Sequence, residues 1–251
     1  MKLFLPLLYL LAFQISVEAS DNRFPPIKAI YNYNGQAPMF DSGDMHSITQ
    51  KNGLKISWIS KNGSRQTWFM KPEYFQDQVE CGEFQCDADS PVPCYGKCIC
   101  SPPVVHLYDS RDKKLYFSVA LDFGSNVPHV VFLADLNRKR VSHLFDTYGS
   151  GLDSFVISPS GLFLACLTSW HGSACAAGNN MEIYDTQKHI VLKPAVKPNP
   201  DLTMREYAFY RSVEWLSNSK LRLRGRSWNC QGVDGDDQIP IEAIVDLPGV
   251  K

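Results

Sequence analysis

Short runs of β-favouring residues alternate with turn-forming residues along most of this chain, and this alternation limits its fold more than any other feature. From residue 102 onward, runs rich in Val, Ile, Leu, Phe and Tyr are separated by Asp, Ser, Gly and Asn. Short strands at this spacing are typical of an all-β domain. We expect strands at residues 104–108, 115–121, 130–133, 141–145, 154–157, 162–167, 181–184, 190–192, 211–216, 221–226 and 240–245. Helical periodicity has one modest candidate, at residues 202–210.

The strand pattern contains a repeat. Apolar strands end in an Asp at Asp135, Asp185 and Asp246, so successive copies lie 50 and 61 residues apart. Residues 155–165 form a strand, a tight turn and a second strand, and residues 213–223 repeat this order.

The turn within the first copy, Ser158-Pro159-Ser160-Gly161, resembles a turn in the blades of WD-repeat and Tol-type β-propellers. In those families a Ser-Pro-Asp-Gly turn joins the first two strands of a blade, and Ser160 stands here in place of the Asp. The resemblance implies about three blades of four strands within residues 102–251 and a possible fourth within residues 27–70. Because propellers usually have four to eight blades, the expected fold is a small or open β-propeller-like array of antiparallel sheets, with a twisted β-sandwich as the alternative.

Residues 1–19 have the three parts of a secretory signal peptide: a positive charge, an apolar run and small residues before the cleavage position. The apolar run is shorter than the roughly 20 residues that span a membrane, and no second run approaches that length. We therefore predict a secreted or periplasmic protein, without membrane insertion after cleavage, whose mature chain begins near Ser20.

Export changes the expected state of the cysteines. Eight of them, all after the predicted cleavage site, are Cys81, Cys86, Cys94, Cys98, Cys100, Cys166, Cys175 and Cys230. In an oxidising compartment an even number predicts disulfide bonds, each worth roughly 2–4 kcal/mol. A zinc knuckle is the alternative for the first five, but their spacing matches no pair of Cys-x-x-Cys arms. Because five is odd, at least one of these five either bonds to one of the later three or stays reduced.

The first five cysteines define a segment of their own. Residues 71–103 are rich in Cys and Pro and have little strand pattern, so we expect a disulfide-rich insertion. It would separate an N-terminal β segment, residues 20–70, from a β-repeat region, residues 104–251. The insertion is either a structural brace or a rigid epitope whose order lowers the entropic cost of binding a partner.

Catalytic patterns are scarce. His171, Ser173 and Cys175 crowd one loop, but no orienting acid accompanies them, and a disulfide between Cys175 and Cys230 is the simpler interpretation. Closely spaced Asp residues at 234–237 suit Ca²⁺ but lack the EF-hand pattern, which favours a solvated turn. We predict no catalytic residue, no metal and no cofactor.

Two groups of residues are candidates for binding. Arg222, Arg224 and Arg226 alternate with smaller or apolar residues, which places three guanidinium groups on one face of a strand. They form either a solvated face paired with nearby acids or a stripe that binds carboxylates. Trp170 and Trp228, each preceded by Ser in corresponding positions of the repeat, are either core residues or an exposed aromatic platform.

One modification motif is also present. Residues 62–64 are Asn-Gly-Ser, a glycosylation sequon that has meaning only if the source is eukaryotic.

Two classes of function fit this sequence. Lys and Arg number 25 and Asp and Glu number 26, a net charge of -1 that predicts no nucleic-acid partner. The favoured class is an exported, disulfide-stabilised, non-enzymatic protein-binding module, for example a periplasmic immunity protein or inhibitor. The alternative is a secreted hydrolase that acts on glycans or cell-wall material. A carboxylate pair that converges with Arg or His in one cleft would favour the hydrolase.

Overall fold

A computed structural model of the chain shows an all-β fold of four antiparallel sheets. It describes residues 23–25, 27–30, 39–50, 53–80, 98–99, 102–121, 126–171, 177–194, 196, 206–229 and 240–247. Within these ranges the helical structure is one turn, α1 (Glu73–Gln76). No helix there is long and apolar enough to cross a membrane.

Each sheet is a meander in which strands consecutive in sequence pair side by side. The first sheet contains β1 (Lys28–Ile30), β2 (Met39–Ser42), β3 (Met45–Gln50), β4 (Gly53–Ile59) and β5 (Arg65–Met70). The second contains β6 (Val104–Asp109), β7 (Lys114–Ala120), β8 (Val127–Asp135) and β9 (Arg140–Gly149). The third contains β10 (Gly151–Ile157), β11 (Phe163–His171), β12 (Ala177–Asp185) and β13 (Ile190–Leu192). The fourth contains β14 (Glu206–Ser217), β15 (Lys220–Asn229) and β16 (Pro240–Asp246).

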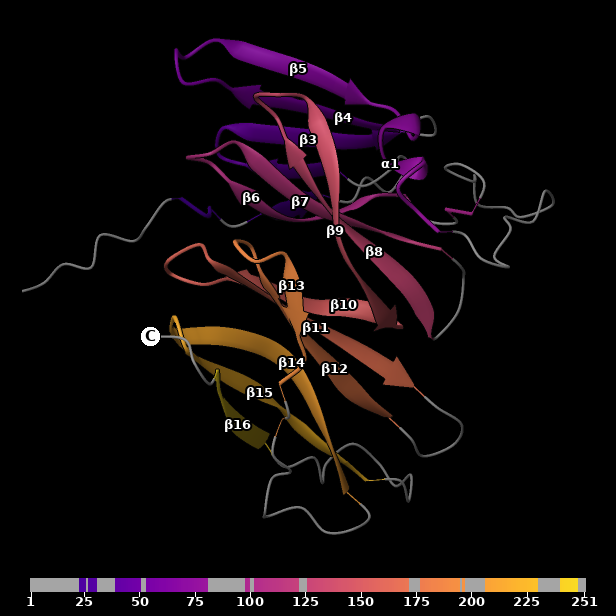
Figure 1. The fold of residues 1–251 in the computed structure, drawn as a ribbon, viewed down its shortest axis with the longest axis vertical. Helices are drawn as coiled ribbons and strands as arrows, with labels where there is room; N and C mark the ends of the chain where they lie inside the picture. Colours follow the sequence, from indigo (N-terminus) through magenta and orange to yellow (C-terminus); the bar gives the residue numbers. More distant parts are fainter. Residues whose placement is uncertain are drawn as a thin grey trace, which may run out of the picture.

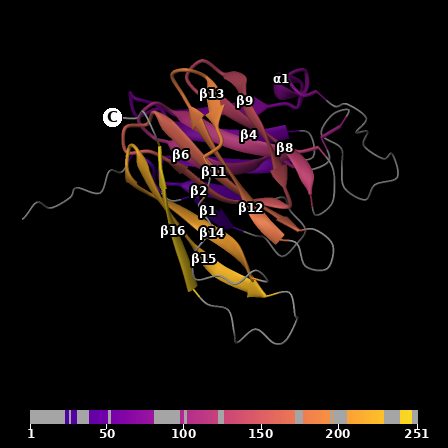
Figure 2. The ribbon, with the colours of Figure 1, turned by 60° about the horizontal axis from the view of Figure 1, so that its bottom comes forward.

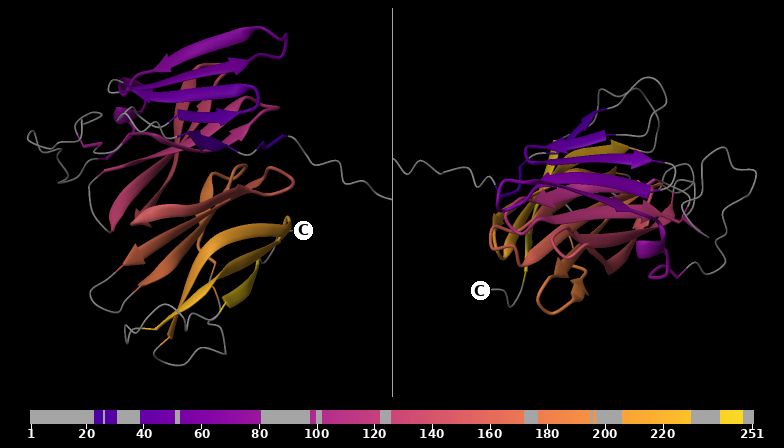
Figure 3. Two further views of the ribbon diagram at one scale, coloured as in Figure 1. Left: turned by 180° about the vertical axis from the view of Figure 1, so that it is seen from behind. Right: turned by 90° about the horizontal axis from the view of Figure 1, so that it is seen from above.

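The four sheets follow one another in chain order from the top to the bottom of Figure 1. The third and fourth sheets lie side by side, with β14 against β12 (Figure 2). The first and fourth sheets lie at opposite ends of the molecule (Figure 3). No hydrophobic cluster joins these two end sheets within the described ranges, so this part of the chain forms an open series.

Successive sheets are joined by buried apolar layers. Alternate residues of β4, namely Leu54, Ile56 and Trp58, are almost completely buried and pack in one cluster with Phe117 and Phe132 of the second sheet. Burial of each such side chain contributes roughly 1.5–3 kcal/mol. A second cluster joins the second and third sheets, and a third joins the third and fourth sheets. Among the described residues, the inner sheets are therefore covered on both faces, whereas the first and fourth sheets each have one face without a hydrophobic cluster.

Asp residues at the ends of three strands close the turns that follow: Asp109 and two members of the repeat, Asp135 and Asp185. The Asp109 Oδ1 atom accepts hydrogen bonds from the backbone N–H groups of Arg111 and Asp112, at 3.0 and 3.2 Å. The Asp185 Oδ1 atom accepts from two backbone N–H groups in the same way, both at 2.9 Å. Asp135 accepts one such bond, at 3.0 Å. An Asp at the end of a strand thus offers its turn the acceptor that an Asx-turn requires.

The two strand–turn–strand copies occupy matching positions in adjacent sheets. Residues 155–165 belong to the β10–β11 hairpin, and residues 213–223 belong to the β14–β15 hairpin. The turns touch: the Ser160 N–H donates to the Asn218 Oδ1 atom at 3.0 Å. The repeat is therefore a repeat of hairpins.

The candidate helix at residues 202–210 is not a helix in its described part. Residues 206–210 form the start of β14 and pair with residues 225–229 of β15. Aromatic residues in this stretch favour a strand when a neighbouring strand is available, and pairing with β15 therefore prevails over the helical spacing.

Candidate functional site

A groove of about 450 Å³ opens on the first sheet. Because Leu54, Ile56 and Trp58 point from β4 into the core, Lys55 and Ser57 point to the opposite face, which no described hydrophobic cluster covers. The groove is lined by Asp41, Gly43, Asp44, Met45, His46, Ile48, Lys55, Ser57, Trp58, Ile59 and Arg65. Its volume lies in the range of sites that bind small ligands or a few side chains of a partner.

Strand register brings these residues together. Asp41 of β2 lies opposite His46 of β3, which in turn lies opposite Ser57 of β4. The Ser57 and Thr67 hydroxyls are hydrogen-bonded at 3.1 Å, which extends this polar row onto β5.

Two further cross-strand pairs flank the polar row. Ile48 lies opposite Lys55, and Ile59 lies opposite Arg65, so aliphatic side chains accompany each cation. The groove therefore offers both charged and apolar contacts.

The charges in the groove are separated. Asp41 and Asp44 lie on β2 and on the turn after it, whereas Lys55 and Arg65 lie on β4 and β5. Adjacent strands are about 4.8 Å apart, so the acidic and basic sides are separated by roughly 10–14 Å. Within the described ranges, neither Lys55 nor Arg65 has an ion pair or a side-chain hydrogen bond, and both are exposed.

Asp44, on the acidic side of the groove, is anchored to the second sheet. Asp44 forms an ion pair with Lys113, whose side chain is only 8% exposed. The Lys113 ammonium also lies 5.8 Å from the centre of the Tyr108 ring. Burial, with the nearby charge of Asp44, raises the pKa of Tyr108, so its hydroxyl stays protonated at physiological pH. Asp44 is thus a fixed carboxylate with a committed partner, while the cations across the groove have none in the described structure.

The predicted arginine stripe proves to be largely neutralised. Arg222 and Arg224 do share one face of the fourth sheet, opposite the face that Leu221 and Leu223 bury. Both arginines pair with Glu214 of β14 and Glu242 of β16, at N–O distances of 3.3–3.7 Å. Arg226 is exposed on the same strand. The solvated face paired with nearby acids is the interpretation that fits Arg222 and Arg224.

The two tryptophans lie near the ends of equivalent strands. Trp170 is half-buried at the end of β11, and its indole ring covers Gly178 of β12, where a Cβ atom would come within 2.9 Å of the ring. The backbone of Trp228 pairs with that of Tyr207. Trp170 therefore packs on its own sheet rather than standing free as a platform.

The prediction that Cys166 belongs to a disulfide is wrong. Cys166 is a completely buried cysteine outside any disulfide bond. It lies in the middle of β11, where its neighbours in register are Phe155 and Glu182, so the sheet brings no second cysteine to it. Cys98 is buried in the core of the first two sheets and is disulfide-bonded. The predictions for Cys81, Cys86, Cys94, Cys100, Cys175 and Cys230 fall outside the described residues.

The state of Cys166 makes a prediction about the remaining thiols. Removing Cys166 from eight cysteines leaves seven, an odd number, so disulfides within the chain must leave at least one more thiol. We expect a monomer denatured without reductant to react with at least two equivalents of a thiol reagent per chain. The variant Cys166→Ser should lose one of them. A titration that finds no thiol in the denatured wild-type protein would contradict the state described for Cys166.

The loop that contains His171 and Ser173 and the acidic turn at residues 234–237 fall largely outside the described residues. Ser173 and the Asp residues at 234–237 lie outside the described residues, and only the backbone of His171, the last residue of β11, is described. Their convergence in one cleft, which would favour a hydrolase, therefore stays a hypothesis. Within the described ranges, no cluster of three or more His, Cys, Asp or Glu residues is arranged to hold a metal ion.

A half-buried histidine on β6 pairs with a serine on β7, two residue types that can serve as a base and a nucleophile. The His106 imidazole is hydrogen-bonded to the Ser118 hydroxyl at 2.7 Å and stacks on the Phe155 ring. Burial, together with the nearby His129, lowers the pKa of His106 to about 3. Ser118 is only 2% exposed, so a substrate has no access to it. The pair lies within the second sheet, and the stacking of His106 on Phe155 of β10 connects it to the third sheet.

Comparisons with known proteins assign no family. No family model and no curated protein matches the chain. Among solved structures it is similar to the tricorn protease, at a TM-score of 0.35 and 11% identity over 83% of this chain and 21% of that one. It is also similar to a eukaryotic initiation factor, at a TM-score of 0.31 and 10% identity over 91% of this chain and 59% of that one. The catalytic domain of the Coprinopsis cinerea GH62 α-L-arabinofuranosidase matches at a TM-score of 0.24 and 11% identity, over 91% and 93% of the two chains. This chain thus spans only part of the first two structures, and similarities this weak define neither its fold nor its function.

Proposed function

We propose that this chain is an exported, non-enzymatic binding module whose groove on the first sheet holds an acidic segment of a protein partner. The observation that carries the proposal is the pair of exposed cations, Lys55 and Arg65, that line a groove and have no acidic partner in the described structure. Arg222 and Arg224, in contrast, are compensated by Glu214 and Glu242.

The lining of the groove specifies the chemistry of the bound segment. Carboxylates of the partner would pair with Lys55 and Arg65, and apolar side chains beside them would contact Ile48 and Ile59. A donor or cation about 10–14 Å away would meet Asp41. Opposite charges placed at such a distance select both the partner and its orientation. An inhibitor of a secreted protein is one concrete form of such a module.

The frame that presents the groove is, in this proposal, an open propeller-like array braced by its Cys-rich segment. The support for the brace is Cys98, which is disulfide-bonded and packs beside Ile99 in the core shared by the first two sheets. The support for the array is the order of four meander sheets with hairpins in matching positions. A rigid frame reduces the ordering cost of binding.

Charge reversal tests the groove. Affinity capture from the extracellular fluid of the source should recover a partner with the wild-type protein, and Lys55→Glu combined with Arg65→Glu should weaken its affinity at least tenfold, because attraction becomes repulsion. The matched control is Lys188→Glu, which reverses an exposed charge on the third sheet and should leave capture unchanged. Identical capture by the wild type and the groove variant would overturn the proposal.

A secreted hydrolase is the second candidate, and one observation favours it: Asp41, Asp44 and His46 line the same groove. A glycosidase needs two carboxylates that can exchange protons with the substrate, but Asp44 is held by Lys113. Release of reducing sugar from glycans by the wild type, abolished in Asp41→Asn, would establish the hydrolase and exclude the binding module.

A further inference from the structure

A modification motif lies at the tip of the hairpin that joins β4 to β5. Asn62-Gly63-Ser64 is the one Asn-x-Ser/Thr sequence in the 251 residues in which x is not Pro. All three residues are exposed. Such a motif is an acceptor for N-linked glycans in exported proteins of cells that have the transferase.

The turn is held by short-range contacts. The Ser60 N–H donates to the Ser64 carbonyl oxygen, and the Gly63 N–H donates to the Ser60 carbonyl oxygen, both at 2.9 Å. Gly63 has φ = 79°, a backbone conformation that glycine adopts without a steric penalty. Because these contacts stay within residues 60–64, the turn can form before the rest of the fold.

The Asn62 amide is oriented for modification. Its Oδ1 atom accepts hydrogen bonds from the Ser64 backbone N–H at 3.2 Å and from the Ser64 hydroxyl at 2.7 Å. A backbone N–H can only donate, so the accepting atom must be the amide oxygen. The Nδ2 atom then points away from these donors and has no hydrogen-bond partner among the described residues.

We propose that Asn62 carries an N-linked glycan, an inference that rests on the export included in the proposed function. The Nδ2 atom attacks the anomeric carbon of a lipid-pyrophosphate-linked oligosaccharide. A C–N bond forms, the bond from that carbon to the pyrophosphate oxygen breaks, and the lipid pyrophosphate leaves while Nδ2 loses one proton. The glycan stands at the rim of the groove, because Ile59 and Arg65, which flank the turn, also line it.

Expression of the whole chain with its own first 19 residues in insect or mammalian cells tests this inference. The secreted protein should carry one glycan that peptide N-glycosidase removes, converting Asn62 to Asp, and intact mass measures both forms. Asn62→Gln and Ser64→Ala should lose the glycan, whereas Ser64→Thr should keep it because threonine also satisfies the motif. The control Asn137→Gln changes an exposed turn Asn outside any such motif and should keep the glycan.

The possible outcomes distinguish a failure of the glycosylation proposal from a failure of the predicted export. A chain secreted with an unmodified Asn62 overturns the glycosylation and leaves the binding module standing. A chain that stays in the cytosol without a glycan overturns both. A mutant series in which Ser64→Ala keeps the glycan would place the modification elsewhere and also overturns the assignment to Asn62.

Discussion

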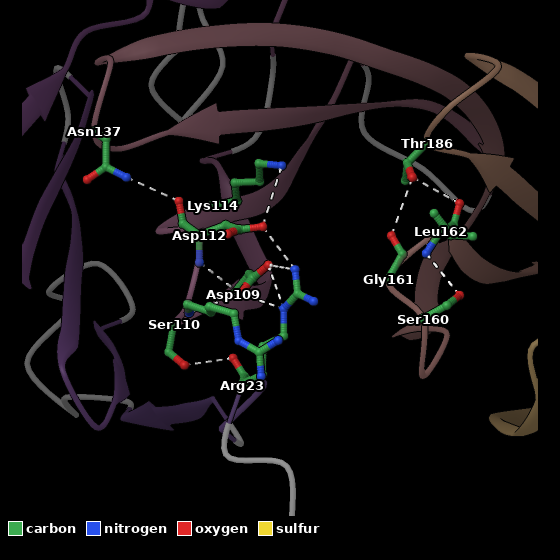
Figure 4. A network of polar contacts seen from close by, with 11 residues as sticks. Arg23, Asp109, Ser110, Asp112, Lys114, Asn137, Ser160, Gly161, Leu162 and Thr186 are labelled. Atoms are coloured by element: carbon green, nitrogen blue, oxygen red, sulfur yellow. Dashed lines mark hydrogen bonds and ion pairs between the residues drawn. The ribbon is translucent and has the colours of Figure 1, made fainter. Parts of the chain in front are cut away.

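Replacing Arg23 with alanine should lower the free energy of unfolding by about 3 kcal/mol, because the change leaves a buried carboxylate without its cation. The Arg23 guanidinium donates from Nε and Nη2 to both carboxylate oxygens of Asp109, at 2.7–3.1 Å, and also contacts Asp112 (Figure 4). Asp109 is only 1% exposed. The Asp109 hydrogen bond raises the pKa of Arg23, so the guanidinium stays charged. Denaturant unfolding measures the effect.

A matched variant and a double mutant isolate the contribution of the Arg23–Asp109 ion pair to stability. Arg138→Ala breaks an ion pair with Asp135 whose arginine is 78% exposed, and we expect a loss below about 0.5 kcal/mol. Asp109→Asn keeps the oxygen that closes the turn, so Arg23→Ala should cost at least about 1 kcal/mol less in that background. Equal losses for Arg23→Ala and Arg138→Ala would show that the segment around Arg23, close behind the predicted cleavage site, is not anchored to the second sheet.

Stability should also fall by about 2–3 kcal/mol when the pH is lowered from 7 to 5. The folded pKa of His106 is about 3, below the ordinary value of 6.5, and burial also lowers the pKa of His129. The unfolded chain therefore binds more protons than the folded one below about pH 6.5, and stability present above that pH is lost as the pH falls toward 3. One pKa unit corresponds to about 1.4 kcal/mol. Denaturant unfolding at both pH values measures the difference.

Substitution of His106 tests whether this residue causes the pH dependence of stability. His106→Gln should remove about 2 kcal/mol of the difference between pH 7 and pH 5, whatever it does to stability at pH 7. Val131→Ala weakens the apolar layer between the same two sheets without removing a titratable group, so it should keep the full difference. A His106→Gln protein with the wild-type pH dependence would contradict the lowered pKa of His106.

Much of the fold follows from local sequence. The strands expected from residue 104 onward are present in the structure, because turn residues punctuate the chain and the Asp at each strand end closes its own turn, as Asp185 does. The candidate helix at residues 202–210 reflected local spacing alone, since pairing with β15 decides the conformation of residues 206–210. The N-terminal anchor was not predictable, because Arg23 and Asp109 are 86 residues apart and only folding brings them together.

The candidate site was harder to predict from the sequence than the fold. The alternation in β15 correctly placed Arg222 and Arg224 on one face, but their partners Glu214 and Glu242 come from neighbouring strands. Lys55 and Arg65 were not singled out, because one polar residue on an alternating strand indicates only a solvated face. What places them on one face is the register of β4 with β5, in which Arg65 lies opposite Ile59 and Ile59 shares the face of Lys55. Among the described residues, no hydrophobic cluster covers that face. The alternation of Lys55 and Ser57 with the apolar residues Leu54, Ile56 and Trp58 was the one signal available.

Hydrogen exchange of the protein alone and bound to its captured partner tests the central claim most directly. The account predicts slower exchange on binding in β2, β3, β4 and β5, the strands around the groove, and unchanged exchange in β14–β16. Protection confined to the fourth sheet would contradict the groove as the binding site. It would instead favour binding at the face of β15 that carries Arg222 and Arg224.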